Sequence, residues 1–259
     1  MAKATPREEF LGKCAWITGA SSGIGLAIAQ KLYDRVETLA LSSRDKNTLI
    51  ARAHQFSQNG GGKRPIFTVR CDVRYRESII GALDRIAVMY ENTVGAADIG
   101  IPDILINNAG AVYFGKTWEY ADEQIAEMLE TNLAGLIHCT RAVLPGMMHA
   151  GRGIIVNILS VASVKTFTGC SVYAAAKAGA LAFSRSLREE LRPHNIKVID
   201  ILAGATETPV WSDDSRAEFG GRMMQPDDIA ETVAAALDLA RRERISPEEI
   251  LVRPRLGDL

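Results

Sequence analysis

Residues 18–25 read Thr18-Gly19-Ala20-Ser21-Ser22-Gly23-Ile24-Gly25 and join a short apolar run, Cys14–Ile17, to a segment with helical periodicity. A helix N-terminus presents unpaired N–H groups and a partial positive charge, which suit a pyrophosphate. Glycine at the three positions leaves room for the turn, for the phosphate and for close packing of helix on strand. Taken alone, the stretch could also be an ordinary glycine-rich turn. Its place after the first strand of an alternating pattern favours a dinucleotide-binding turn.

Short apolar runs alternate with helix-period segments along the rest of the chain. Most runs are nearly continuous in Val, Ile, Leu and Ala, which is typical of parallel strands covered on both faces. This order predicts an α/β fold: a single doubly wound parallel sheet, a Rossmann fold of about seven strands with helices on both faces. The predicted strands are Cys14–Ile17, Thr38–Leu41, Ile66–Arg70, Ile104–Ile106, Gly153–Ile158, Lys197–Ile201 and Ile250–Val252, and the predicted helices lie near 24–34, 45–58, 76–92, 122–149, 173–192 and 226–242.

Residues 1–259 are interpreted as one domain, because no internal repeat or Pro/Ser-rich linker divides them and the cluster Asn59–Gly62 is only a turn. The chain carries 30 basic and 31 acidic side chains, and this balance argues against nucleic acid or an anionic membrane as a partner. No apolar run reaches the roughly 18–20 residues that span a bilayer, and the polar start does not have the pattern of a signal peptide. The expectation is a cytoplasmic protein.

The cysteines and histidines do not form a metal-binding pattern. The four cysteines are scattered without a CxxC spacing, and they are interpreted as buried thiols in a reducing compartment. His138 and His149 have no partners at metal-ligand spacing. We predict no metal site.

Two motifs carry a resemblance to a known family. The spacing of residues 18–25 is TGxxxGxG, and Asn107-Asn108-Ala109-Gly110 follows the fourth predicted strand. Both resemble segments of the short-chain dehydrogenase/reductase family, and the resemblance covers nearly the whole chain. It implies an oxidoreductase that uses a nicotinamide dinucleotide. It also implies a homodimer or homotetramer, often packed through the helices at 122–149 and 173–192.

The end of the second predicted strand bears on the choice of cofactor. An acid about 20 residues past the glycine turn binds the ribose 2′-hydroxyl of NAD, whereas a nearby arginine accommodates a 2′-phosphate. Here Ser42 and Ser43 stand where that acid would be, and Arg44 follows directly. A guanidinium grips a phosphate through two parallel hydrogen bonds. Arg44 could also be a solvated loop residue, and many NADP-linked relatives carry a second basic residue where this chain has Ser22. We predict NADP.

The family resemblance adds further contacts with the cofactor. Asp72 and Val73, after the third strand, resemble the contact with the adenine edge, and Thr208 falls where relatives meet the nicotinamide carboxamide. In full, the predicted cofactor-binding residues are Gly19, Ser21, Ser22, Gly23, Ile24, Gly25, Ser43, Arg44, Asp72, Val73, Asn108, Ala109, Gly110, Tyr173, Lys177, Gly204, Thr206 and Thr208.

Tyr173 and Lys177 begin a predicted helix and stand four residues apart, so they share one helix face. A neighbouring ammonium stabilises a phenolate and lowers the phenol pKa, which creates a proton shuttle for a carbonyl/alcohol pair. A packed ring beside a solvated amine is the common alternative for this spacing. Two more residues favour catalysis. Ser160 ends a strand, where ligands of parallel sheets bind, and its interval to Tyr173 matches the family. Asn132 matches the asparagine of the family's Asn-Ser-Tyr-Lys tetrad, which holds a water that connects the lysine to solvent.

Several features depart from the family or point to the substrate. Leu159 stands where relatives usually have serine, and Ala203-Gly204 replaces the usual Pro-Gly. The ending Glu249–Pro254 also differs from that of acyl-carrier-protein reductases. Residues 207–224 are predicted to form a mobile lid over the substrate. Candidate pocket walls, each of which could equally belong to the core, are Val112, Tyr113, Phe114, Phe167, Trp211 and Met223.

These observations predict an NADP(H)-dependent oxidoreductase that interconverts a small-molecule carbonyl and a secondary alcohol. Tyr173 would exchange the proton and Ser160 would polarise the substrate oxygen, with Lys177 and Asn132 in support. Two alternatives stay open. One is a 3-oxoacyl-thioester reductase of the same family. The other is a non-catalytic sensor or scaffold that binds the dinucleotide.

Overall fold

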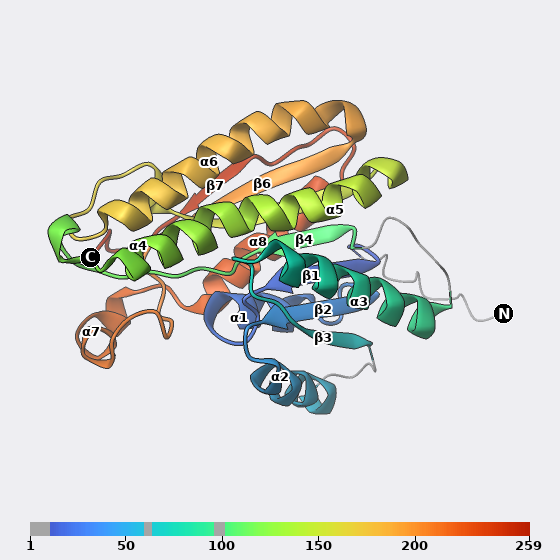
Figure 1. Ribbon diagram of the computed structural model, residues 1–259, viewed down its shortest axis with the longest axis horizontal. Helices are drawn as coiled ribbons and strands as arrows, with labels where there is room; N and C mark the ends of the chain where they lie inside the picture. Colours follow the sequence, from blue (N-terminus) through green and yellow to red (C-terminus); the bar gives the residue numbers. More distant parts are fainter. Residues whose placement is uncertain (1–10, 60–63, 96–101) are drawn as a thin grey trace.

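The computed structural model describes residues 11–59, 64–95 and 102–259. Seven strands in these residues form one sheet in the order β3-β2-β1-β4-β5-β6-β7, and every neighbouring pair is parallel (Figure 1). The prediction of a doubly wound parallel sheet, a Rossmann fold, is confirmed. The start of the chain and residues 60–62 of the turn cluster lie outside the described residues. The strands are β1 (Cys14–Thr18), β2 (Thr38–Ser43), β3 (Ile66–Arg70), β4 (Ile104–Asn107), β5 (Gly153–Ser160), β6 (Ile196–Ala203) and β7 (Glu249–Val252).

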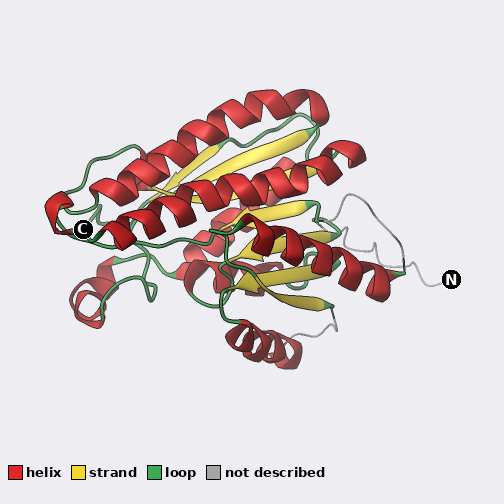
Figure 2. Cartoon of the chain, viewed as in Figure 1, coloured by secondary structure: helices red, strands yellow, loops and turns green. Residues whose placement is uncertain are grey.

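Helices cover both faces of this sheet (Figure 2). One layer contains α1 (Gly23–Leu32), α2 (Lys46–Asn59) and α8 (Pro226–Ala240). The other layer contains α3 (Arg76–Val94), α5 (Leu136–Ala150) and α6 (Ser171–Leu191). The short helix α4 (Asp122–Leu129) precedes α5 and packs against α6. A further short helix, α7 (Asp213–Phe219), lies in the connection from β6 to α8, to one side of the layers (Figure 1).

The strands are apolar on both faces because each face meets a helix layer. In β1, Ala15 and Ile17 belong to the cluster under α1 and α8, whereas Cys14 and Trp16 belong to the cluster under α3 and α5. Successive side chains of a strand point to opposite faces, so a strand covered on both sides has no polar alternate positions. This packing explains the nearly continuous Val, Ile, Leu and Ala runs of the sequence.

The helix predicted over 122–149 differs from the structure in its middle. The structure divides it into α4, a π-helical segment at Glu130–Gly135 and α5, which ends at Ala150. Asn132 lies in the π segment and is buried. Its amide donates to the carbonyl oxygens of Met128 and of Ala111, at 2.9 and 2.6 Å. The second bond reaches outside the helix, so the widened turn carries a contact that an α-helix prediction does not foresee.

The other predicted helices are confirmed with shifts of one or two residues at their ends. α7 was not predicted; the sequence analysis treats residues 207–224 only as a lid. The lid closes on itself at its base, where Thr206 pairs with Met224 in a β-bridge. Leu159, where relatives usually have serine, is buried against Leu136, Ala180, Leu181 and Leu202.

The sheet reverses its order between β1 and β4, and parallel sheets bind ligands at such a point, beyond the carboxyl ends of the strands. Thr18, Asn107 and Ser160 end β1, β4 and β5 on that edge. Within the described ranges, no helix is both long and apolar enough to cross a membrane, and no group of three His, Cys, Asp or Glu side chains there could hold a metal ion. The four cysteines are free and buried, as expected.

Candidate active site

The glycine turn connects β1 to α1 at the carboxyl edge of the sheet. Gly19 and Gly23 have φ angles of +66° and +54°, in the region that favours glycine. A Cβ atom at Gly25 would lie 2.5 Å from the carbonyl oxygen of Gly19, so no side chain fits there. Ser22 precedes α1 without a side-chain capping bond, and the first turn of α1 holds no acidic residue. No capping hydroxyl or carboxylate competes for the N–H groups of this turn, which fits a pyrophosphate.

The remaining predicted residues of the turn lie around the same helix start. Ser21 is half-buried and Ser22 is exposed, so both hydroxyls are near the surface of the groove. Ile24 turns toward the core and packs against the cluster beneath α1. Its contribution to a cofactor site therefore comes from its backbone N–H rather than from its side chain.

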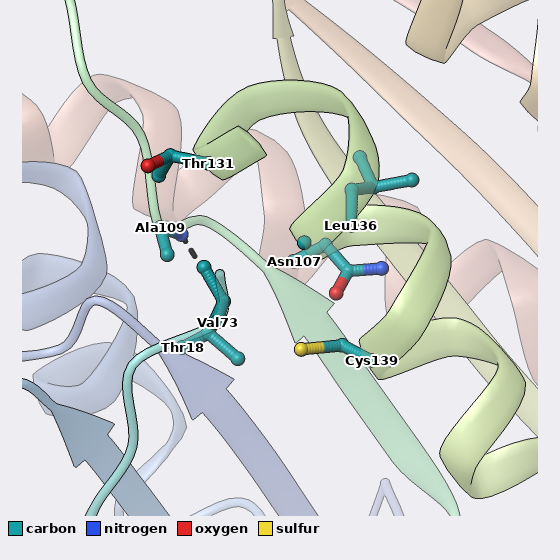
Figure 3. A pocket seen from close by; sticks show the side chains of 8 residues that line it. Thr18, Val73, Asn107, Ala109, Thr131, Leu136 and Cys139 are labelled. Carbon is teal, nitrogen blue, oxygen red and sulfur yellow. Dashed lines mark hydrogen bonds between the residues drawn. The ribbon is translucent and has the colours of Figure 1, made fainter. Parts of the chain in front are cut away.

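Thr18 ties the glycine turn to the end of β4. Its hydroxyl accepts hydrogen bonds from the backbone N–H groups of Asn108 and Ala109, at 3.0 and 3.1 Å (Figure 3). The Asn108 amide donates back to the carbonyl oxygens of Thr18 and Gly19, at 3.0 and 3.1 Å. Asn108 therefore lies at the glycine turn, and its amide binds the backbone of that turn. Thr18 was quoted in the motif but not predicted as a site residue.

Val73 and Ala109, two predicted cofactor contacts, line one small hollow (Figure 3). Thr18, Asn107, Thr131, Gly135, Leu136 and Cys139 complete its walls. Gly110 follows Ala109, and a Cβ atom there would lie 3.1 Å from the Asn132 amide oxygen. The structure thus brings Val73, Ala109, Gly110 and Asn132 together, although three different segments of the sequence supply them.

Asp72 is held in place by Arg74. The Arg74 guanidinium forms a fork on the carboxylate, with Nη2–Oδ2 at 2.6 Å and Nε–Oδ1 at 3.0 Å. These bonds lower the pKa of Asp72 below its usual value. The carboxylate is therefore ionised and fixed beside Val73, and its contact with the adenine stays a prediction.

Arg44 extends from the end of β2, and 65% of its side chain is exposed. Its Nη1 donates to Oε1 of Glu127 on α4 at 2.8 Å. The Tyr113 hydroxyl donates to the other oxygen of the same carboxylate at 2.6 Å. These two donors lower the pKa of Glu127, Tyr113 first, and the carboxylate in turn raises the pKa of Tyr113. Ser43 is buried and donates to the carbonyl oxygen of Asp45, so it shapes the turn that carries Arg44.

Tyr173 and Lys177 lie on one face of α6, as their spacing predicts. The Lys177 ammonium is buried and lies 5.8 Å from the centre of the Tyr173 ring. It donates to the carbonyl oxygen of Ile158 in β5 at 2.9 Å. Burial lowers the pKa of Lys177 to about 8.

The expected lowering of the Tyr173 pKa is wrong for the protein by itself. Burial raises the pKa of Tyr173, and a hydrogen bond with Ser160 opposes this only in part. The physical reason is the position of the ammonium, which lies beside the ring and is engaged by the carbonyl of Ile158. The backbone N–H of Ala162 donates to Ser160 Oγ at 3.1 Å, which leaves the hydroxyl proton for the tyrosine oxygen or a ligand.

The loop from β4 to α4 (residues 108–121) is bound to the start of α6. The backbone N–H of Gly115 and the Tyr120 hydroxyl donate to the carbonyl oxygen of Gly169, at 2.9 and 3.0 Å. Asn132 fixes the other end of the loop, since its amide oxygen accepts from the N–H of Ala111 while its nitrogen donates to that residue's carbonyl. The β4–α4 loop and the segment before Tyr173 therefore form one connected wall.

The lid meets this wall through two aromatic rings. Phe114 and Trp211 stack with their ring centres 5.0 Å apart and an interplanar angle of 17°. The Trp211 indole donates to the carbonyl oxygen of Thr206 at 2.9 Å. Among the other predicted wall residues, Val112 and Tyr113 are half-buried within the loop, Phe167 is half-buried in the segment before α6, and Met223 is a buried residue of the lid itself.

The segment after β6 carries the last predicted cofactor contacts. Gly204 donates to the carbonyl oxygen of Val252, and the buried hydroxyl of Thr206 donates to the carbonyl oxygen of Gly204. Both residues therefore shape the base of the lid. Thr208 lies against the glycine turn, because a Cβ atom on Gly23 would be 3.2 Å from Thr208 Cγ2. Thr208 is the residue of this segment that faces the groove.

Three residues of this region were missed by the sequence analysis. Thr18 could have been found, since it opens the quoted motif. Thr131 stands next to Asn132, but nothing in the sequence places it in a hollow with Val73. Glu127 has the pattern of a solvated acid on an amphipathic helix, and its contact with Arg44 spans 83 residues.

Comparison with known proteins gives a consistent result. A family model described as short chain dehydrogenase matches residues 13–218. An uncharacterized oxidoreductase from Staphylococcus aureus (strain MRSA252) is 30% identical over 242 residues, which cover 93% of this chain and 97% of that protein. An alcohol dehydrogenase from the archaeon Thermococcus sibiricus, complexed with 5-hydroxy-NADP, superposes with a TM-score of 0.81 at 28% identity, covering 95% of this chain and 98% of that one. A variant actinorhodin polyketide ketoreductase with NADPH gives 0.82 at 28% identity, covering 96% and 98%.

Proposed function

Because the chain belongs to the short chain dehydrogenase family, we propose that it is an NADP(H)-dependent oxidoreductase that interconverts a carbonyl and a secondary alcohol. The observation that carries this proposal is the convergence of Ser160, Tyr173 and Lys177. Ser160 ends β5, Tyr173 and Lys177 lie in the first two turns of α6, and the Ser160 side chain interacts with Tyr173. A hydroxyl pair backed by a buried amine suits proton exchange with a substrate oxygen.

Each residue of the group has a distinct task in this proposal. Tyr173 holds the proton that is exchanged with the substrate oxygen, and Ser160 donates a hydrogen bond that fixes this oxygen. Lys177, whose pKa is about 8, can lose a proton near neutral pH and so return one to Tyr173. Asn132 supports this relay by holding the backbone of the β4–α4 loop. The nicotinamide, when bound, supplies or accepts the hydride.

The residues present fit a dinucleotide. The first turn of α1 offers its N–H groups, and glycine at 25 avoids a Cβ atom 2.5 Å from the carbonyl oxygen of Gly19. Two features support NADP over NAD: the missing acid at positions 42 and 43, and the exposed guanidinium of Arg44. The two solved structures described above carry NADP-type ligands, which agrees with this assignment.

Turnover of a substrate panel tests the proposal. Oxidation of NADPH is followed at a fixed enzyme concentration with ketones, aldehydes and 3-oxoacyl thioesters. We expect turnover of at least one ketone or aldehyde. We also expect that Tyr173→Phe loses turnover while its affinity for NADPH is largely kept. Full turnover by Tyr173→Phe would contradict the role of the phenol, and oxidation with thioesters alone would favour the acyl-thioester alternative. No turnover with any compound would favour the non-catalytic alternative.

The cofactor assignment has its own test. Wild type is expected to use NADPH with a higher kcat/KM than NADH, and Arg44→Ala is expected to reduce this preference about tenfold or more, since a bidentate phosphate contact is lost. A preference of wild type for NADH would contradict the assignment. The proposal further includes a single-domain homodimer or homotetramer in the cytoplasm, with residues 207–224 as a lid that opens for the substrate.

A further inference from the structure

We propose that Glu127 is a positioning residue that competes with the cofactor 2′-phosphate for Arg44 and thereby couples this phosphate to the β4–α4 loop. The inference rests on the proposed NADP preference. It concerns a residue on α4, 83 positions from Arg44 in the sequence. Three observations carry it: the position of the carboxylate between two donors, its burial relative to Arg44, and the hydrogen bonds that lead from it toward Tyr173.

The carboxylate of Glu127 has two partners that serve different ends of the site. Oε1 accepts from Arg44 Nη1 at 2.8 Å, and Oε2 accepts from the Tyr113 hydroxyl at 2.6 Å. Arg44 is the residue proposed to bind the 2′-phosphate, whereas Tyr113 belongs to the β4–α4 loop. One carboxylate therefore bridges the phosphate end of the cofactor groove and the wall of the substrate pocket.

The two side chains of the ion pair differ in exposure. Only 20% of the Glu127 side chain is exposed, against 65% for Arg44. The carboxylate is thus the fixed member of the pair, and the guanidinium is the member that can turn toward a ligand. A phosphate dianion that binds Arg44 meets this carboxylate as a like charge. Occupation of Arg44 by phosphate must therefore weaken the bond to Glu127.

When Arg44 turns away to a phosphate, the Tyr113 hydroxyl still donates to Glu127. Both donors lower the pKa of Glu127, which shows that both stabilise the same negative charge. A carboxylate that loses one donor binds the other more strongly. The 2′-phosphate is therefore expected to strengthen the hydrogen bond between Tyr113 and Glu127.

This effect is transmitted to the segment before Tyr173 through hydrogen bonds of the β4–α4 loop. The single proton of the Tyr120 hydroxyl is shared between the carbonyl oxygens of Tyr113, at 3.2 Å, and Gly169, at 3.0 Å. Gly169 stands four residues before Tyr173. A firmer bond at Tyr113 thus steadies the loop that is attached to the start of α6.

Binding of two adenosine nucleotides to the full chain tests the competition without any turnover. The probes are adenosine 2′,5′-bisphosphate and adenosine 5′-monophosphate, with dissociation constants from calorimetry. We expect Glu127→Gln to bind the bisphosphate about threefold tighter, with the affinity for the monophosphate unchanged. Glu123→Gln, one helical turn earlier on the exposed face of α4, removes the same charge. It is expected to change the dissociation constant of either nucleotide by less than about 1.5-fold, half of the threefold effect.

Tyr113→Phe tests whether Arg44 and Tyr113 share the Glu127 carboxylate, because it removes a donor without changing any charge. This substitution removes the second donor, so Glu127 holds Arg44 more firmly and the bisphosphate binds about twofold weaker. The same substitution in the Glu127→Gln background is expected to have no effect on the bisphosphate. Hydrogen exchange supplies a second readout: the bisphosphate should slow exchange over residues 111–121 in wild type and not in Glu127→Gln.

The outcomes distinguish this inference from the proposed function. Equal binding of the two nucleotides by wild type would overturn the NADP assignment and the inference together. A wild-type preference for the bisphosphate that Glu127→Gln leaves unchanged would overturn the inference alone. The inference would also be overturned by a Tyr113→Phe effect that persists without Glu127, because the two residues would then act independently.

Discussion

The Lys177 ammonium donates to the carbonyl oxygen of Ile158 at 2.9 Å, inside the protein and beside the Tyr173 ring. A buried amine in this position carries a cost in stability. Burial disfavours its charged form and lowers its pKa from 10.5 to about 8. In this protein, the lysine of the tyrosine–lysine pair therefore titrates close to physiological pH.

The first prediction concerns the pH dependence of the free energy of unfolding. The pKa of Lys177 is lower in the folded state, so the unfolded state binds more protons between pH of about 8 and 10.5, and stability rises with pH across that window. Below it, the full cost of burying the charge applies, roughly 3–4 kcal/mol. Lys177→Met lacks this cost. We expect Lys177→Met to be more stable than wild type at pH 7 and to lose that advantage by pH 10.5.

Urea unfolding at several pH values measures this difference. All other groups titrate in both proteins, so their contributions cancel when the two curves are subtracted. A difference that stays constant from pH 7 to 10.5 would show that Lys177 keeps its ordinary pKa in the folded protein.

The second prediction concerns the end of the chain. The Asp258 carboxylate accepts from Lys165 Nζ at 2.6 Å and from Arg253 Nε at 3.0 Å, and only 8% of its side chain is exposed. Lys165 lies between Ser160 and Tyr173, so Asp258 anchors the segment that connects two proposed catalytic residues. We expect Asp258→Asn to speed hydrogen exchange over residues 164–170 about threefold or more and to raise KM for the carbonyl substrate. The cost in global stability should stay below about 1 kcal/mol, because Lys165 and Arg253 are about half exposed.

The same anchor should depend on pH in wild type. The Arg253 guanidinium and the Lys165 ammonium hold the pKa of Asp258 below its usual value. A lowered folded-state pKa contributes stability above the unfolded value of 3.8, and this contribution is lost as the pH falls below it. Asp213→Asn, on the exposed surface of α7, is the matched control and should leave exchange over residues 164–170 unchanged. Equal exchange in Asp258→Asn and wild type would refute the anchor.

The third prediction concerns the contact between lid and wall. Phe114 and Trp211 stack at 5.0 Å, and such pairs contribute roughly 0.5–1.5 kcal/mol beyond their buried area. We expect Phe114→Ala to shift the lid toward open forms and to raise KM for the carbonyl substrate about twofold to tenfold. Phe114→Leu, which keeps much of the apolar area, should have a smaller effect. Tryptophan emission of a Trp16→Phe, Trp118→Phe background reports on Trp211, and unchanged emission after Phe114→Ala would contradict a stack in solution.

The sequence predicts the sheet well because its signal is local. Every strand between helix layers needs apolar residues on both faces. Strands such as Thr38–Leu41 and Ile104–Ile106 can therefore be recognised within four or five residues of sequence. The glycines of the turn are recognised from their spacing alone, although the atoms that exclude a side chain at Gly19 and Gly25 include those of Asn108, which follows β4. The spacing of Tyr173 and Lys177 likewise predicts a shared helix face.

The features that the sequence did not predict depend on contacts between distant segments. The π-helical turn at Asn132 is tied to a bond with Ala111, which belongs to another loop. The raised pKa of Tyr173 follows from the burial of its phenol, and a rule of residue spacing contains no information on burial. Glu127 meets Arg44 and Tyr113 only once α4, the end of β2 and the β4–α4 loop have come together in the fold. Local patterns specify elements and motifs; these interactions arise when the elements pack.

The fourth prediction concerns a buried ion pair beneath the proposed site. Asp200 is fully buried in β6 and accepts hydrogen bonds from Ser184, at 2.6 Å, and from Arg188 Nη2, at 2.7 Å. Asn157 of β5 also donates to it, at 2.9 Å. Removing one partner of such a pair leaves an uncompensated charge inside the protein and costs roughly 3–5 kcal/mol. We expect Asp200→Asn to lower the free energy of unfolding by about this amount.

A double-mutant cycle with Arg188 tests this ion pair. Arg188→Met removes the cation and leaves the carboxylate, so it should cost a similar amount, whereas the double variant leaves no buried charge and should cost clearly less than the sum of the two. Glu248→Gln, whose side chain is 41% exposed at the edge of this group, is the control and should cost less than about 1 kcal/mol. Denaturant unfolding measures all four variants. Additive effects of Asp200→Asn and Arg188→Met would mean that the two side chains stabilise the sheet separately, despite the 2.7 Å between their charged atoms.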